Sequence, residues 1–168
     1  LAKILIDAGF APTVIVGSLM KDLRSNFVHG DSDLLVVEAC EYKDHLLELS
    51  PEILVITNIE LDHTDWFPDL ESIQTMFQKA VDALPGNCVL ITNEQSLTTD
   101  RKITAFSDES APELQMIGEF NKENARAAKV AATVVAERIG TMLSDEQIDA
   151  SLASFQGTWR RFEYKGKT

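Results

Sequence analysis

Four short apolar runs constrain the fold of this chain more than any other feature of its sequence. They read TVIV over 13–16, LLVVE over 34–38, ILVIT over 53–57 and CVLIT over 88–92. Because almost every residue in each run is apolar, both faces of the strand it forms must be buried, which is typical of parallel strands between two layers of helices. The runs therefore predict an α/β fold, with a mainly parallel sheet and flanking helices.

A stripe of apolar residues at helical spacing separates the third run from the fourth. It consists of Leu70, Ile73, Phe77, Ala80, Val81 and Leu84. Pro85 and Gly86 end the stripe, so it completes a strand-helix-strand unit. The two strands of this unit are expected to pair in parallel.

Other segments predict further elements. Apolar spacing favours helices over 1–8 and 121–139, and a third helix after the N-cap residue Ser144. Two weaker apolar segments, 103–106 and 114–117, are expected to form an antiparallel edge of the sheet.

Composition limits the class of protein. The chain has 168 residues, 27 acidic and 15 basic side chains and a formal net charge of −12, so one globular domain without nonspecific affinity for nucleic acid is expected. No apolar run approaches the ~20 residues that cross a bilayer, so no membrane partner is expected. The two cysteines, Cys40 and Cys88, are too few for a disulfide framework or a four-thiolate zinc site, which favours a reducing, cytoplasmic location.

Polar side chains follow two of the predicted strands. Glu38 ends the second run, and Asn58 and His63 follow the third. An open parallel sheet binds ligands at the carboxyl ends of its strands, where a carboxylate and an imidazole together can hold a hard divalent ion. The alternatives are a solvated Glu38, a His63 that only caps a turn, and a Glu41 that is either a second ligand or solvated.

Two further groups could contact a nucleotide. Asn121 and Asn124 share one face of the first turn of the alanine-rich helix, where their amides could recognise the edge of a base. Arg160 and Arg161 are adjacent cations that could clamp phosphate oxygens. An ordinary N-cap at Asn121 and a solvated arginine pair are the alternatives.

The succession VVEACEY, ITNIELDH, GEFNKENARAA and FQGTWRRFE resembles the central ATP-binding domain of the Mur ligase family, which builds the peptide of peptidoglycan. The resemblance covers residues 1–163, and 164–168 resemble the start of a linker to a further domain. It is strongest to the members that add L-alanine to UDP-N-acetylmuramate and to those that ligate murein peptides. It implies a P-loop-type fold.

The resemblance implies a role for each candidate residue. Glu38 and His63 would bind the Mg²⁺ that bridges ATP and the acyl substrate, and Asn58 matches an active-site asparagine. The implied nucleotide contacts are Asn121 and Asn124 at adenine, and Arg161, with Arg160 as its partner, near the phosphates.

The implied activity is ATP-dependent formation of an amide bond during synthesis of peptidoglycan precursors. The substrate carboxylate would attack the γ-phosphate to give an acyl phosphate, which the incoming amino group then attacks. The resemblance also implies that the UDP sugar and the amino acid bind through domains outside this sequence. The family's G-x-x-G-K-T-T loop would precede Leu1 and is not in the sequence, so the chain by itself is expected to be inactive.

Other functions remain open at this point. The chain could derive from a murein peptide ligase, a folate polyglutamylating relative, or a degenerate nucleotide-binding module that acts alone and lacks catalysis. Several relatives carry a carbamylated lysine at a position that falls near Gln78 and Lys79, and no carbamate is assigned here.

Overall fold

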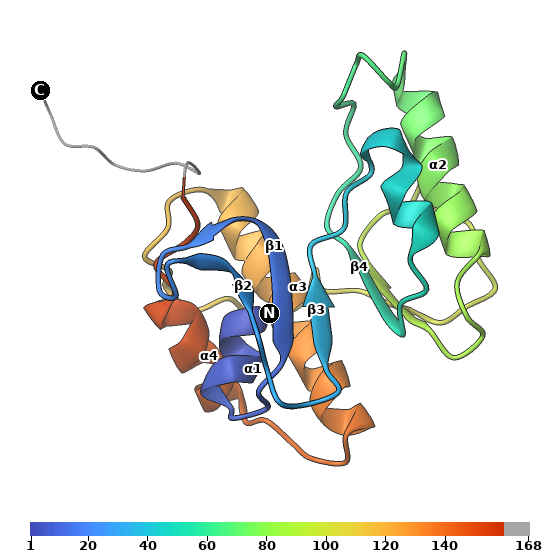
Figure 1. Cartoon of the computed structure of the whole chain (residues 1–168). Helices are drawn as coiled ribbons and strands as arrows, with labels where there is room; N and C mark the ends of the chain where they lie inside the picture. The colour runs from blue at the N-terminus through green and yellow to red at the C-terminus, as the bar shows by residue number, and fades with distance from the viewer. Residues whose placement is uncertain (160–168) are drawn as a thin grey trace, which may run out of the picture. The chain divides into compact units, whose positions relative to one another are not determined.

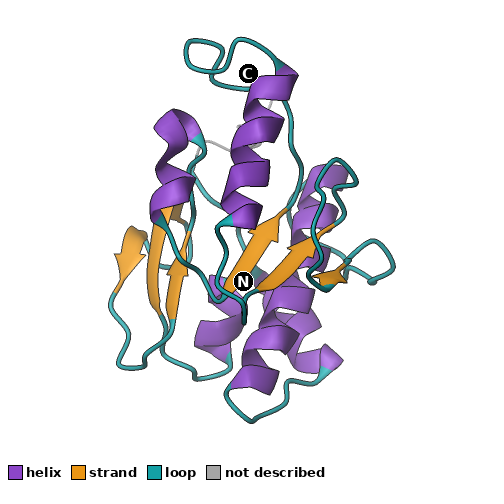
Figure 2. Cartoon of the chain, turned by 90° about the vertical axis from the view of Figure 1, so that its right-hand side faces the viewer, coloured by secondary structure: helices purple, strands orange, loops and turns teal. Residues whose placement is uncertain are grey.

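The strands of the protein form two sheets rather than the single sheet expected. The structure, a computed structural model, describes residues 1–159 (Figure 1). The described chain separates into two compact units. We call them the terminal unit, which contains Leu1–Glu38 and the described residues from Glu109 onward, and the inserted unit, Ala39–Asp108. The strands accordingly fall into two groups in Figure 2.

The terminal unit combines a three-stranded sheet with three helices. Its elements are α1 (Ala2–Asp7), β1 (Thr13–Met20), β2 (Ser25–Val28), β3 (Leu35–Val37), α3 (Glu119–Arg138) and α4 (Asp145–Ser154). The strand order is β2-β1-β3, in which β1 is parallel to β3 and antiparallel to β2. The predicted strands at 13–16 and 34–38 and all three predicted helices are confirmed.

Strand β2 was not predicted, and β1 is longer than expected. Strand β1 pairs with β2 as an antiparallel hairpin, in which Ile15 lies opposite Phe27 and Met20 lies opposite Ser25. Ile15 is 45% exposed and Phe27 is 52% exposed, so one face of this sheet is open in the described chain. The expectation that both faces are covered is therefore wrong for this sheet.

The inserted unit contains the all-parallel sheet. Its elements are η1 (a 3-10 helix, Tyr42–Glu48), β4 (Ile53–Ile56), α2 (Leu70–Asp82), β5 (Val89–Thr92) and β6 (Ile103–Thr104). The strand order is β4-β5-β6, with both pairs parallel. The predicted strand-helix-strand unit is confirmed, and together the two sheets are mainly parallel.

The expected antiparallel edge is wrong. The first of its two segments gives β6, which pairs with β5 in parallel, Leu90 opposite Ile103. The segment 114–117 forms no strand. The backbone carbonyl of Ile117 instead accepts a hydrogen bond from the side chain of Asn121, so the end of this segment is used to start α3.

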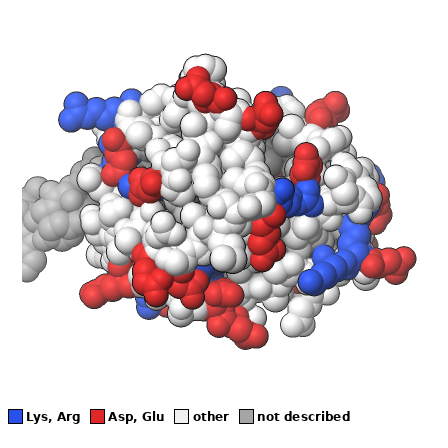
Figure 3. Space-filling model, turned by 90° about the horizontal axis from the view of Figure 1, so that it is seen from below, with Lys and Arg blue, Asp and Glu red and all other residues white. Residues whose placement is uncertain are grey.

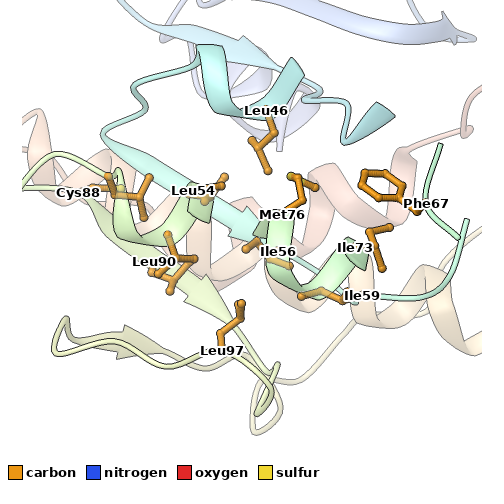
Figure 4. Packing of buried hydrophobic residues seen from close by; sticks show 13 residues of the cluster. Leu46, Leu54, Ile56, Ile59, Phe67, Ile73, Met76, Cys88, Leu90 and Leu97 are labelled. Carbon is orange, nitrogen blue, oxygen red and sulfur yellow. The ribbon is translucent and has the colours of Figure 1, made fainter. Parts of the chain in front are cut away.

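The core of the inserted unit lies between the sheet, α2 and η1 (Figure 4). Residues from each element take part, including Leu46 of η1, Ile56 of β4, Met76 of α2 and Leu90 of β5. Ile59 and Phe67, which follow β4, are also buried in this cluster. The loop after β4 is therefore anchored in the core at two points.

Local sequence explains where the helices begin. Asp69 and Ser72 form a reciprocal capping box at the start of α2, and Ser144 and Gln147 form another at the start of α4, the N-cap that the sequence predicts. Helix α3 begins at Glu119, two residues before the predicted position. Its N-cap is Gly118, whose φ of +112° is in a region that favours glycine. Asn121 is thus not the N-cap.

The surface charge and the polarity of the helices agree with the acidic composition of the chain. Acidic side chains are spread over the face in Figure 3, and no broad basic patch interrupts them there. None of the helices within residues 1–159 has the length and apolar character required to span a bilayer.

Candidate functional site

The loop that leaves β4 carries two of the predicted site residues. Asn58 is exposed just beyond the carboxyl end of β4, and His63 follows in the same loop. Between them, the buried Ile59 donates its backbone N–H to Oε1 of Glu94 at 2.8 Å. Sequence order and the sheet together place both residues at the end of the strand where open α/β sheets bind ligands.

His63 lies in a tight turn. Its φ is +51°, and its carbonyl oxygen accepts hydrogen bonds from the N–H groups of Trp66 (2.7 Å) and Phe67 (2.9 Å). The N–H of His63 donates to Oδ1 of Asp62 at 2.6 Å. A left-handed backbone is uncommon for a residue with a Cβ, and such conformations cluster at functional sites.

The imidazole of His63 meets two carboxylates. Its Nε2 lies 3.3 Å from Oε1 of Glu41, and the nearest donor atoms of Glu41, Asp62 and His63 all lie within 4.8 Å of one another. We call these three residues the His63 cluster. One imidazole nitrogen and two carboxylates are a donor set for a hard divalent ion, which takes its other ligands from water or phosphate.

Aromatic rings form one side of the His63 cluster. The ring of Tyr42 lies 4.8 Å from the imidazole of His63, centroid to centroid, and 6.4 Å from the ring of Trp66. The Tyr42 hydroxyl donates to Oδ2 of Asp65 at 2.8 Å. This hydrogen bond to a carboxylate stabilises the neutral phenol and raises the pKa of Tyr42 above its ordinary value. Tyr42 therefore stays uncharged beside the imidazole.

Glu38 belongs to the terminal unit. It directly follows β3, and its N–H donates to the carbonyl of Ile15 at 2.9 Å. Its Oε2 accepts the N–H of Gly17 at 2.7 Å. The carboxylate is thus held at the predicted strand end, and its approach to His63, a residue of the other unit, stays a prediction.

The two asparagines of α3 differ in their surroundings. Nδ2 of Asn121 donates to the carbonyl of Ile117 at 2.8 Å, whereas Asn124 is exposed one turn further along. Their spacing gives them a common helix face, as expected. A role for either residue at adenine stays a prediction.

Arg160 and Arg161 lie outside the described residues. Gln78, near which the resemblance puts a carbamylated lysine of several relatives, has other partners. Its Nε2 donates to Asp82 and to the carbonyl of Thr98, and its Oε1 accepts the N–H of Thr98. Lys79 is exposed on α2.

The sequence interpretation missed part of the site. The sequence pattern does not single out Asp62, although it directly precedes His63, and it leaves Glu41 open between a ligand and a solvated residue. The hydrogen bond from Tyr42 to Asp65 joins the start of η1 to the loop after β4, so no local pattern indicates it.

Comparisons with known proteins agree on one family. The sequence model of the Mur ligase middle domain matches residues 18–109. A UDP-N-acetylmuramate--L-alanine ligase of Caldicellulosiruptor bescii is 32% identical over 98% of this chain and 43% of its own length. The ligase of the same name from Salinibacter ruber is 31% identical over 98% of this chain and 41% of its own length. The chain thus spans less than half the length of these relatives.

Solved structures support the fold. A UDP-N-acetylmuramate:L-alanyl-gamma-D-glutamyl-meso-diaminopimelate ligase of Neisseria meningitides matches 95% of this chain and 62% of its own length, with a TM-score of 0.75 and 23% identity. A UDP-N-acetylmuramate-alanine ligase of Thermotoga maritima matches 99% of this chain and 44% of its own length, with a TM-score of 0.73 and 20% identity. The α/β fold expected from the sequence is therefore confirmed.

Proposed function

Since this chain belongs to the Mur ligase family, we propose that it forms the central ATP-binding domain of a ligase that joins L-alanine to UDP-N-acetylmuramate. The observation that supports this most is the similarity to enzymes of that name along 98% of the chain. We propose that residues 1–163 form this domain and that 164–168 lead into a linker. The UDP sugar and the amino acid would bind through other parts of the protein.

The donor set of the His63 cluster fits Mg²⁺. Two carboxylates and one imidazole nitrogen lie close enough to share an ion, and two of the three side chains are only partly buried, so coordination positions remain for water and phosphate oxygens. We propose His63 and Glu38 as metal ligands, with Glu41 and Asp62 as the additional carboxylates. A bound Mg²⁺ would neutralise negative charge on the phosphates during transfer.

The residues of the chain would orient the reactants. The exposed amide of Asn58 stands at the carboxyl end of β4, where it can donate to an oxygen of the acyl substrate or of the γ-phosphate. Asn121 and Asn124 would hold adenine, and Arg161 with Arg160 would hold phosphate oxygens. Phosphoryl transfer depends mostly on such positioning and charge neutralisation, because little covalent chemistry falls to the protein.

The proposed reaction has two steps. A carboxylate oxygen of UDP-N-acetylmuramate attacks the γ-phosphorus of ATP, so that an acyl phosphate forms and ADP leaves. The amino nitrogen of L-alanine then attacks the acyl carbon, phosphate leaves, and the nitrogen loses its proton. The products are an amide, ADP and inorganic phosphate.

The test uses the full-length protein that contains this sequence. We expect release of phosphate that depends on UDP-N-acetylmuramate, L-alanine, ATP and Mg²⁺, with an amide product in equal amount. His63→Ala should lower kcat by about a hundredfold or more, because charge stabilisation in the transition state is lost. His45→Ala, which changes an exposed histidine outside the cluster, is the matched control and should retain activity.

Other outcomes would change the assignment. Turnover with L-alanyl-γ-D-glutamyl-meso-diaminopimelate but not with L-alanine would replace the proposed substrate by a murein peptide. Absence of turnover with every acceptor, together with retained ATP binding, would instead indicate a nucleotide-binding module without catalysis.

A further inference from the structure

Glu94 ties the end of β5 to the loop that carries the predicted site residues. Its Oε1 accepts the N–H of Ile59 at 2.8 Å. Ile59 lies directly after Asn58 and precedes His63 in the same loop. The contact therefore acts on the backbone between two residues of the proposed site.

The position of Glu94 explains why a side chain is needed there. The parallel ladder between β4 and β5 ends with the pair Ile56 and Thr92. Ile59 lies beyond this pair, so the ladder gives its N–H no backbone carbonyl as acceptor. A buried N–H that has no acceptor lowers the stability of the fold. The carboxylate of Glu94 supplies that acceptor, so it continues the connection between the two strands after the ladder has ended.

Glu94 is itself held in place. Its N–H donates to Oγ1 of the buried Thr92 at 3.0 Å, and its Oε2 accepts the hydroxyl of Ser96 at 3.3 Å. Ile59 is fixed on its other side as well, because its side chain is 8% exposed within the core of the inserted unit. The loop thus leaves the sheet from a point that is restrained through both backbone and side chain.

We infer that Glu94 is a positioning residue that sets the orientation of the loop bearing Asn58 and His63. This inference rests on the proposed function, since the loop matters only if those residues act on the substrates or the metal. Groups displaced by as little as about 1 Å can lose about a hundredfold in rate, which makes such a restraint consequential.

The same strand end offers a matched control. Oδ1 of Asn93, the neighbour of Glu94, accepts the N–H groups of Phe106 (2.9 Å) and Ser107 (3.1 Å). Asn93 therefore also restrains a backbone segment by its side chain, but that segment follows β6 and carries no proposed site residue. Removal of either side chain should lower stability, whereas only removal of Glu94 should affect the site.

The experiment compares Glu94→Ala, Glu94→Gln and Asn93→Ala in the full-length protein that contains this sequence. We expect Glu94→Ala to speed hydrogen exchange of the Ile59 amide and to lower kcat, each by about tenfold or more. Glu94→Gln keeps the Oε1 acceptor, so its Ile59 exchange rate and its kcat should both stay close to those of the unchanged protein. Asn93→Ala should lower the melting temperature while leaving kcat within about twofold. If Glu94→Ala does not fold, Glu94→Asp replaces it in the experiment. Its carboxylate is one methylene shorter, so exchange of the Ile59 amide should still be faster and kcat lower, each by a smaller factor.

The inference is overturned if Glu94→Ala, or the Asp variant in its place, retains the kcat and Ile59 exchange of the unchanged protein. It is also overturned if Asn93→Ala lowers kcat as much as Glu94→Ala does. If the unchanged protein has no ligase activity, the proposed function is wrong, but this result does not test the role of Glu94. Titration with Mn²⁺ then decides the inference, because Glu94→Ala should weaken binding that Asn93→Ala leaves intact.

Discussion

Nε2 of His63 lies 3.3 Å from Oε1 of Glu41, and the two residues come from different loops of the inserted unit. Glu41 directly precedes η1, whereas His63 follows β4. The contact shows that the segment before η1 meets the loop after β4. Glu41, whose role the sequence leaves open, is therefore a member of the cluster.

Replacement of Glu41 should weaken metal binding. Glu41→Gln removes one anionic donor from the His63 cluster while keeping the size of the side chain, so we expect the affinity for Mn²⁺ to fall by about tenfold or more. Titration calorimetry with Mn²⁺ measures this change. Glu48→Gln, at the exposed end of η1, is the control and should bind as before. Equal affinity of Glu41→Gln and the unchanged protein would remove Glu41 from the metal site.

The link between Tyr42 and Asp65 should be visible in a pH titration. The Asp65 carboxylate accepts the phenol proton in a hydrogen bond and so holds the pKa of Tyr42 above its ordinary value of 10.0. Asp65→Ala removes the acceptor, and the pKa should fall toward that value. Ultraviolet absorbance of tyrosinate, measured in a Tyr164→Phe background, follows Tyr42 as the remaining one of the two tyrosines. An unchanged midpoint after Asp65→Ala would contradict the contact.

Lys129 should stabilise the terminal unit in a pH-dependent way. Its side chain is 5% exposed, and Nζ lies 3.3 Å from Asp149 and 3.4 Å from Asp145, both on α4. Burial by itself lowers the pKa of the ammonium group, but the two carboxylates outweigh this effect and raise the pKa above 10.5. The folded protein thus holds the proton more tightly than the unfolded chain, so the contribution is complete below about pH 10.5 and is lost as the pH rises further.

Lys129→Met keeps most of the aliphatic stem and removes the charge. We expect a loss of about 2 kcal/mol in the free energy of unfolding near neutral pH, because hydrogen bonds to charged groups are lost. Urea unfolding at a series of pH values measures this difference, which should shrink above about pH 10.5. A difference that stays constant across that range would mean that packing, rather than the ion pairs, accounts for the effect.

Arg101 should stabilise the end of α2. Its guanidinium donates to the backbone carbonyls of Leu84 and Pro85, which follow the last turn of the helix. Arg101→Met leaves these carbonyls without their charged donor and should lower the unfolding free energy by about 1 to 3 kcal/mol. Lys102→Met, a change of the exposed neighbour, is the control in the same denaturant experiment. Equal stability of both variants would show that water replaces the arginine.

The sequence predicts the elements whose pattern is local and continuous. The runs that became β4 and β5, the stripe of α2 and the capping box of α4 are examples. Strand β2 could not be predicted, because Phe27 is exposed and the strand depends on pairing with β1 rather than on burial. The direction of β6 could not be predicted either, since two paired residues give no periodic pattern.

The site follows the same division. The strand-end positions of Asn58 and His63 follow from the order of strand and loop, whereas the contact between Glu41 and His63 depends on how two loops fold back on each other. The contact between Glu94 and Ile59, which are 35 residues apart in the sequence, joins the ends of two adjacent strands, so only the tertiary structure shows it. Local order therefore predicts where the candidate site lies, and tertiary contacts determine which carboxylates lie beside it.

Transfer of heavy oxygen from the substrate tests the central claim most directly. UDP-N-acetylmuramate labelled with heavy oxygen at both oxygens of its carboxylate is incubated with L-alanine, ATP, Mg²⁺ and the full-length protein that contains this sequence. An acyl phosphate predicts that each inorganic phosphate released during amide formation carries one heavy oxygen, and that His63→Ala suppresses both products together. Unlabelled phosphate accompanying the amide, or unchanged product formation by His63→Ala, would contradict the account.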